Sequence, residues 1–348
     1  MDARLSDEQE QIRETAEQLA RQLGPASPES LPARDDGRKA WSRLAELGFL
    51  GLRIPEEAGG SLLSGVEVAL VAEQLGRFSV PLPFIGSAVC ASELLRAAGA
   101  GKDVLSALAD GSLRLAPVVD PSMRRWARPG EAGIAFESRG AAAGLVVEPE
   151  TACLRAVELG PVAESQDLTR ELRRIDAEAP TLDVGDLGSP VSPDARGRAL
   201  ALTLSALAAD LVGVMQAALD LAVAYTGERE QFGVKVGTFQ ALQHMAAEAL
   251  VSVEAARGCA WHAAWSVDAL PTQKALESAH AAKAYTSEQA REVCETGIQM
   301  HGGIGMTWEA MPHVHLRRAL LGRLMLGDEQ AHYARLADLR LVRPEETR

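Results

Sequence analysis

Two short stretches in the C-terminal part of the sequence combine glycine with polar side chains. The first, at residues 299–309, reads QMHGGIGMTWE and contains two adjacent glycines, a histidine and a glutamate. Glycine lets another group approach the backbone closely because it has no Cβ atom. Gly302 and Gly303 can therefore either end a helix in an ordinary turn or form a cradle whose backbone N–H groups bind a phosphate-bearing ligand.

The second stretch, at residues 229–244, reads REQFGVKVGTFQALQH. A guanidinium such as that of Arg229 can bind a phosphate through two hydrogen bonds, and Gln240 and Gln243 can bind a neutral polar ligand. The alternative is a helical hairpin in which Arg229 is solvated and Phe232 and Phe239 are core residues. Together the two stretches favour a phosphate cradle over a simple turn.

The pairing of REQFG…GTFQALQH with QMHGGIGMTWE resembles the signature of the acyl-CoA dehydrogenase family. The resemblance covers nearly the whole chain and is close to short actinobacterial-type members in HGGIGMTWE and HLRRALLGRLMLGDEQAHYARLA. It implies FAD as the cofactor and acyl-CoA or a related acyl thioester as the substrate. The implied reaction is α,β-dehydrogenation, in which a carboxylate takes the α-proton and FAD takes a hydride from Cβ.

The resemblance also implies cofactor-binding residues that usually act across a subunit interface. Arg229, Phe232 and Gln240 correspond to contacts with the FAD of a neighbouring subunit. Gln299, Met300, His301, Gly302 and Gly303 correspond to contacts with its adenosine and pyrophosphate.

The position of the family's catalytic glutamate falls on Gly327 in this sequence. Asp328 is the adjacent acid and our candidate base, although an aspartate there is also typical of a helix N-cap. The family's other known location for the base falls near Thr203, where the nearest acid is Asp210. We interpret Glu309 as a structural or adenosine-side residue. Removing an α-proton requires a carboxylate whose pKa is raised by a desolvated pocket.

The middle of the chain also departs from the family pattern. It has RLAPVVDPSMRRWARP where the family has a Leu-Thr-Glu-Pro-x-Ala-Gly-Ser-Asp-like strand, and it lacks the Trp-Ile-Thr strand that lies against the isoalloxazine. We therefore expect either a homo-oligomer (dimer or tetramer) or an α2β2 assembly with a paralogous subunit that supplies the base and the flavin-ring contacts. The alternative is a non-redox or catalytically incomplete member that acts as an assembly or binding subunit beside an active paralogue.

Periodicity predicts the elements that position these residues. Helix-like patterns, then short apolar runs separated by Gly and Pro, then helix-like patterns again indicate an α+β fold rather than alternating βαβ units. We predict an N-terminal all-α domain at 1–111, a small, reduced middle antiparallel β-domain at 112–190 and a C-terminal four-helix bundle at 191–348. Ser6 and Gln9 are spaced as a capping box.

Individual elements follow from the same patterns. Four strands are predicted at LRLAPVV, GIAFES, GLVVEP and CLRAVEL. Helices are predicted at 64–77 and 85–99, and the four long C-terminal helices at 198–228, 237–268, 270–299 and 311–341.

Composition limits the possible partners. The 348 residues carry a net charge of −13 with acids and bases interspersed, so we expect no nucleic acid partner. The N-terminus has no apolar targeting segment and we find no predicted membrane span, which favours a cytoplasmic protein. The seven histidines contain no HExxH pattern and the four cysteines no CxxC pair, so no metal site is expected.

Overall fold

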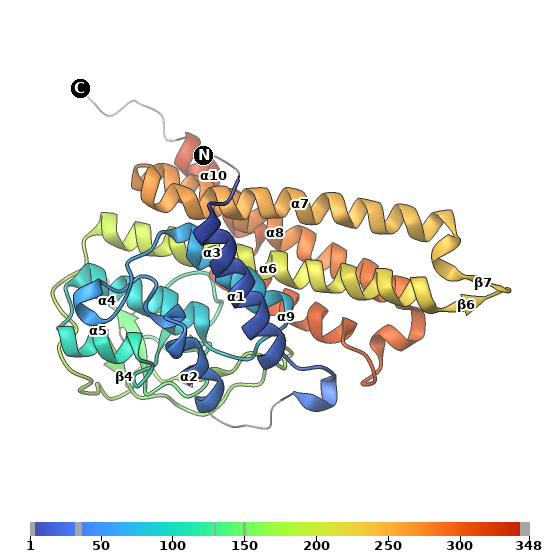
Figure 1. The fold of residues 1–348 in the computed structure, drawn as a ribbon. Helices are drawn as coiled ribbons and strands as arrows, with labels where there is room; N and C mark the ends of the chain where they lie inside the picture. Colours follow the sequence, from blue (N-terminus) through green and yellow to red (C-terminus); the bar gives the residue numbers. More distant parts are fainter. Residues whose placement is uncertain (1–3, 32–36, 129, 149–150, 342–348) are drawn as a thin grey trace.

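The N-terminal part of the computed structural model is helical (Figure 1). The structure describes residues 4–31, 37–128, 130–148 and 151–341. The helices are α1 (Asp7–Leu23), α2 (Arg38–Glu46), α3 (Gly65–Arg77), the π-helix η4 (Phe84–Ala91), α4 (Ser92–Ala98) and α5 (Lys102–Ala109), with 3-10 turns η1 (Pro28–Ser30), η2 (Phe49–Gly51) and η3 (Glu56–Ala58). The predicted helix at 85–99 is thus a π-helix continued by an α-helix.

The capping box at the start of α1 is confirmed. Ser6 Oγ accepts a hydrogen bond from the Gln9 backbone N–H at 3.2 Å, and Gln9 Oε1 accepts one from the Ser6 N–H at 3.1 Å. Two of the N–H groups that a helix start leaves without intrahelical partners are thereby satisfied.

The middle of the chain forms one five-stranded sheet. Its strands are β1 (Leu115–Val119), β2 (Gly133–Phe136), β3 (Ala143–Val147), β4 (Leu154–Val157) and β5 (Leu172–Ile175), in the order β4-β3-β1-β2-β5. The expectation of a purely antiparallel sheet is wrong, because β1 and β3 pair in parallel. An alternating apolar pattern encodes which face is buried but not the direction of the neighbouring strand.

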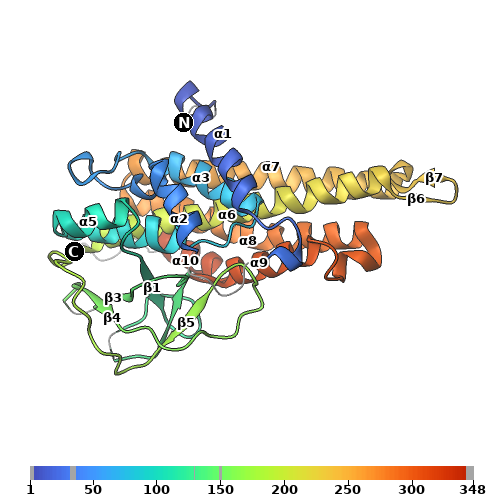
Figure 2. The ribbon, with the colours of Figure 1, turned by 60° about the horizontal axis from the view of Figure 1, so that its bottom comes forward.

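The strand β5 was not predicted, because its sequence LRRI shows only Leu172 and Ile175 as apolar residues. Both are buried, and the strand pairs antiparallel with β2. In Figure 2 the sheet lies on one side of the layer of helices.

The C-terminal part is built from long helices. They are α6 (Pro193–Glu228), α7 (Gln240–Ala269), α8 (Thr272–His301), α9 (Pro312–Leu324) and α10 (Glu329–Leu341), with the hairpin β6 (Glu230–Gln231) and β7 (Val234–Lys235) and the 3-10 turns η5 (Val236–Thr238) and η6 (Gly302–Met306). The last predicted helix is split in two. The break contains Leu326 at φ +59° and Gly327 at φ +113°, conformations that cannot continue an α-helix.

The first long helix, α6, is the centre of the molecule. It is long and apolar enough by composition to cross a membrane, but 78% of the relevant window is buried inside the protein, as in a core helix. Close packing against α3 depends on two glycines. A Cβ atom on Gly76 would lie 2.3 Å from the Asp210 carbonyl oxygen, and one on Gly213 would lie 2.0 Å from that of Glu73.

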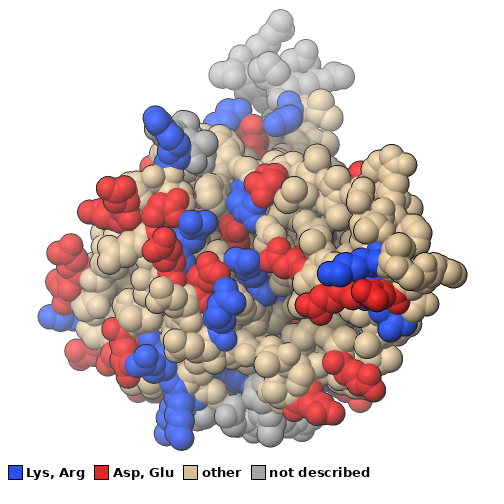
Figure 3. All heavy atoms as spheres, turned by 45° about the vertical axis from the view of Figure 1, so that its right-hand side comes forward, with Lys and Arg blue, Asp and Glu red and all other residues tan. Residues whose placement is uncertain are grey.

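The bundle extends beyond the N-terminal helices and the sheet, with the β6–β7 hairpin at its tip (Figures 1 and 2). Figure 3 looks from the side to which this tip points and shows acidic and basic side chains interspersed.

Candidate functional site

Both glycine-containing stretches lie at one end of the bundle. We call this region, residues 225–243 and 299–309, the distal end. The ring of Tyr225, near the end of α6, stacks on that of His301, the last residue of α8, with centroids 4.7 Å apart and planes 21° apart. This contact brings together two segments that are more than seventy residues apart in the sequence.

The side chains of the first stretch are mostly exposed. Arg229 follows α6 and is exposed, and so is Gln240, the first residue of α7. Phe232 is 92% exposed at φ +56° and touches the half-exposed Phe239 edge to face. The alternative of two core phenylalanines is therefore wrong. Gln243 donates its amide to the Gly237 carbonyl and closes the η5 turn.

The two glycines of the second stretch have open space around them. No atom outside the neighbouring residues lies within 4 Å of a Cβ built on Gly302 or Gly303. Gly302 has φ +67° and its N–H donates to carbonyls at the end of α8, so it also ends the helix. The same two glycines can thus both end the helix and form a phosphate cradle.

Around the glycines, only part of the predicted set faces outward. Gln299 is exposed, but Met300 is buried. The His301 ring is also buried and its Nδ1 lies 2.7 Å from the Gly297 carbonyl. Met300 and His301 therefore pack inside the end of α8 and are largely covered by the protein.

An exposed tryptophan on the same turn was missed by sequence reasoning. Trp308 is 58% exposed, near the 64% exposed Met306. The available signal was an aromatic residue five positions after the glycine pair, which is weak because single aromatic residues are common.

A second candidate region lies where the three parts of the chain meet. We call Glu137, Arg170, Asp210 and Arg318 the junction network. Arg170 donates to Asp210 at 2.6 Å and to Glu137 at 2.9 Å, and Arg318 donates to the other Asp210 oxygen at 2.6 Å. All four side chains are at least 97% buried, so the network joins the sheet to α6 and α9 without solvent.

The junction network engages Asp210, the acid that the sequence places nearest to the family's second location for the base. Burial acts to raise the pKa of Asp210, but Arg170 and Arg318 outweigh it and the net pKa is lowered. Glu137 has its pKa raised by burial, yet it also accepts from the Gly86 N–H at 2.7 Å. Both oxygens of Asp210 are occupied by cations, which makes it unsuitable as a base.

The turn that contains Gly327 holds Asp328 in a structural arrangement. Asp328 Oδ1 accepts from the Ala331 N–H at 2.9 Å as a helix cap, and Oδ2 lies 3.7 Å from Arg124. The first contact is the helix cap that the N-cap alternative predicts, and the second is an ion pair with the loop after β1. Glu309 is exposed on the distal end.

Three basic groups are buried directly below this turn. Lys283 Nζ donates to the carbonyls of Arg323 at 2.9 Å and Gly327 at 3.1 Å, and to Ser287 Oγ at 3.0 Å. Burial lowers its pKa to about 7. His280 and His332 meet with their Nδ1 atoms 2.8 Å apart, and burial lowers the pKa of His280 to about 4 and of His332 to about 2.

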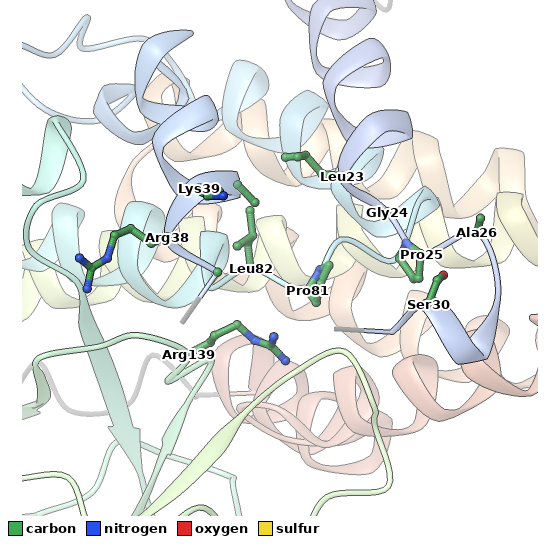
Figure 4. A pocket seen from close by; sticks show the side chains of 12 residues that line it. Leu23, Gly24, Pro25, Ala26, Ser30, Arg38, Lys39, Pro81, Leu82 and Arg139 are labelled. Atoms are coloured by element: carbon green, nitrogen blue, oxygen red, sulfur yellow. The ribbon is translucent and has the colours of Figure 1, made fainter. Parts of the chain in front are cut away.

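A cavity of about 680 Å³ lies elsewhere, between the end of α1, the start of α2 and the loop after β2 (Figure 4). Arg38, Lys39, Leu82 and Arg139 contribute to its lining. None of its lining residues belongs to the predicted cofactor set. Within the described ranges, no group of three or more His, Cys, Asp or Glu side chains is arranged to hold a metal ion.

Comparisons with known proteins agree with the resemblance. Family models described as "Acyl-CoA dehydrogenase, N-terminal domain" and "Acyl-CoA dehydrogenase, C-terminal domain" match residues 6–108 and 198–339. The chain is 33% identical to acyl-CoA dehydrogenase IpdE2 of Mycobacterium tuberculosis over 320 residues, which are 90% of this chain and 91% of that protein.

Solved structures have the same fold. A variant of the Tcur3481-Tcur3483 steroid ACAD gives a TM-score of 0.78 at 26% identity, covering 96% of this chain and 97% of that one. The ChsE4-ChsE5 complex from Mycobacterium tuberculosis gives 0.82 at 20% identity, covering 99% and 100%. With its two family domains and a full-length relative, this chain belongs to the acyl-CoA dehydrogenase family of FAD-dependent oxidoreductases.

Proposed function

We propose that this chain is a subunit of an acyl-CoA dehydrogenase that catalyses α,β-dehydrogenation of an acyl thioester in the cytoplasm. Its distal end holds the adenosine and pyrophosphate half of an FAD whose flavin ring lies in another subunit. The Tyr225–His301 contact carries the proposal, because it gathers Arg229 and the Gly302–Gly303 cradle at one exposed end.

The distal end suits a dinucleotide. Backbone without Cβ atoms allows close approach of phosphate oxygens, and an exposed guanidinium can neutralise them. When bound, FAD would act as the hydride acceptor. This chain's residues bind and orient its phosphate half, since they offer a cation and open backbone on the surface.

The region expected to hold the flavin ring fits less well. After β1 the chain turns back on itself around Asp120, whose carboxylate accepts from the N–H groups of Arg124 and Arg125. Trp126 then pairs with Val119. At the end of β2, Glu137 is held in the junction network. These groups are engaged within the chain and support a ring site on a different subunit.

The two acids considered as the base are also engaged. Asp210 is held between two arginines and Asp328 caps α10. A thioester α-proton needs a carboxylate that is desolvated and without a cation partner. We therefore assign the base to a paralogous subunit in an α2β2 assembly. Two solved relatives with this fold bear paired names, Tcur3481-Tcur3483 and ChsE4-ChsE5, which supports such a pairing.

The test is flavin content and mass of the chain purified alone and after co-expression with its neighbouring paralogue. We expect a flavin absorbance band only in the co-expressed preparation, at the mass of a mixed oligomer. Flavin in the chain alone would favour a homo-oligomer. Absence of flavin from both preparations would contradict the proposal and favour the non-redox assembly subunit.

Arg229→Ala tests the role of the distal end in the mixed oligomer. Losing a charge-assisted contact to phosphate should lower FAD affinity about tenfold or more. Lys235→Ala is the matched control, since Lys235 is an exposed cation on the same hairpin. Equal FAD affinity in both variants and the wild type would remove Arg229 from the cofactor site.

A further inference from the structure

We propose that Trp308 stacks on the adenine ring of the dinucleotide held by the Gly302–Gly303 cradle, and so selects FAD over flavins that lack adenine. The inference rests on the proposed function, because it adds a residue to the same cofactor site.

Trp308 belongs to the same compact turn as the glycines. After η6, the N–H of Thr307 donates to the Ile304 carbonyl at 3.0 Å, and its Oγ1 donates to the same oxygen at 2.9 Å. The Ala310 N–H in turn donates to the Thr307 carbonyl at 3.3 Å. These bonds fix the backbone on both sides of Trp308 relative to the cradle.

The indole is exposed but its orientation is fixed. The His313 ring meets it at an angle of 75° with centroids 5.1 Å apart, and the Arg317 guanidinium lies 5.9 Å from its centre. Arg317 also donates to the Gln166 carbonyl of the middle domain at 3.2 Å. A flat ring supported in this way leaves 58% of the side chain open to solvent.

An exposed, oriented indole suits a flat aromatic ligand. Aromatic side chains bury a large area and prefer stacked or edge-on partners, and nucleobases stack on them without needing specific hydrogen bonds. The adenine is the ring that follows the pyrophosphate through the ribose, so it is the part of FAD nearest to a phosphate cradle. The exposed Ile304 and Met306 extend the apolar surface of the turn.

The experiment uses the assembled oligomer, freed of cofactor and titrated with FAD, ADP or FMN. Binding is followed by flavin fluorescence for FAD and FMN and by isothermal titration calorimetry for ADP, so that the readout does not depend on Trp308. For Trp308→Ala we expect a loss of about 5- to 150-fold in FAD and ADP affinity, the range measured for base stacking. FMN binding should stay unchanged, because FMN has no adenine. Trp308→Phe should retain most of the affinity.

Met306→Ala is the matched control, since it removes an exposed apolar side chain from the same turn without removing a ring. The oligomer mass of each variant is measured in parallel. Unchanged FAD and ADP affinity in Trp308→Ala, or dissociation of the oligomer with ADP affinity retained, would overturn the proposal and show that the indole packs against protein. If the wild-type oligomer binds no FAD, the proposed function itself fails, which separates the two conclusions.

Discussion

The distal end of the bundle and the junction network use charged residues in opposite ways. At the distal end, Arg229 and the open glycines face solvent. At the junction, Arg170 and Asp210 are almost fully buried and neutralise each other. In a buried ion pair, each charged group has lost its hydration water and is bound to its partner instead. Neither group can interact with a substrate unless the pair is broken.

In the proposed function, the chain contributes the half of the cofactor site that is built from exposed residues. Exposed residues at the distal end contribute little to the hydrophobic core, so their side chains are available to bind a ligand. The junction network joins the sheet to α6 and α9 and at the same time engages Asp210, one of the acids considered as the base. Four predictions, beginning with the largest expected effect, extend this contrast from these two regions to the turn at Gly327.

Arg170→Met should break the junction network. It leaves Asp210 with one cation and Glu137 without its main partner, and removing one member of a buried ion pair costs about 3–5 kcal/mol. The measurement is the free energy of unfolding in urea. Arg291→Met is the control, because its pair with Glu295 is exposed and should contribute only about 0–1 kcal/mol. Similar losses in both variants would show that the junction is not specially stabilised.

Acid should destabilise the region below the Gly327 turn. The pKa of His280 is lowered to about 4 in the folded protein, against about 6.5 when unfolded. The unfolded state therefore binds more protons below pH 6.5, and the free energy of unfolding falls as the pH drops toward 4. The slope is up to about 1.4 kcal/mol per pH unit for each histidine. His332 has the same sign.

Other charged groups act on the same cluster, notably Lys283 on His332 and Arg335 on both rings. The double variant His280→Asn with His332→Asn should therefore show a shallower pH dependence between 6.5 and 4 than the wild type. His244→Asn is the control, because that histidine is exposed at the start of α7. Parallel curves for the double variant and the wild type would contradict the assignment.

Gly303→Val should weaken FAD binding without weakening the fold. The position is open, so the free energy of unfolding should change by only about 0.5 kcal/mol. The added side chain would obstruct hydrogen bonds to phosphate, which lowers FAD affinity about 10- to 100-fold. Gly258→Val is matched, because Gly258 on α7 also has open space around it. Equal FAD affinity in the two variants would exclude the cradle.

Asp328→Asn should have the smallest effect. Asparagine caps a helix about as well as aspartate, so the unfolding free energy should change by about 0.5 kcal/mol or less. Dehydrogenation by the mixed oligomer should also continue at the wild-type rate if the base lies on the paralogue. A large loss of kcat without a loss of stability would instead identify Asp328 as the base.

The sequence determined the long helices and four of the five strands of the middle sheet, because hydrophobic periodicity and caps are local. The Ser6 capping box and the long helices α6 to α8 follow from spacing alone. It also determined the family, since the two distal stretches are specific as a pair. It did not reveal β5 or the parallel pairing of β1 with β3, because strand direction depends on partners that are distant in sequence.

The tertiary structure decided which polar residues are available. The sequence offers both Asp210 and Arg229 as candidate site residues. In the structure, Asp210 is buried between Arg170 and Arg318, whereas Arg229 lies on the surface. The Tyr225–His301 contact joins two segments that no local pattern could place together. Burial and long-range contacts decide whether a charged side chain stabilises the fold or is available to bind a ligand. Burial and long-range contacts arise only when the chain is folded.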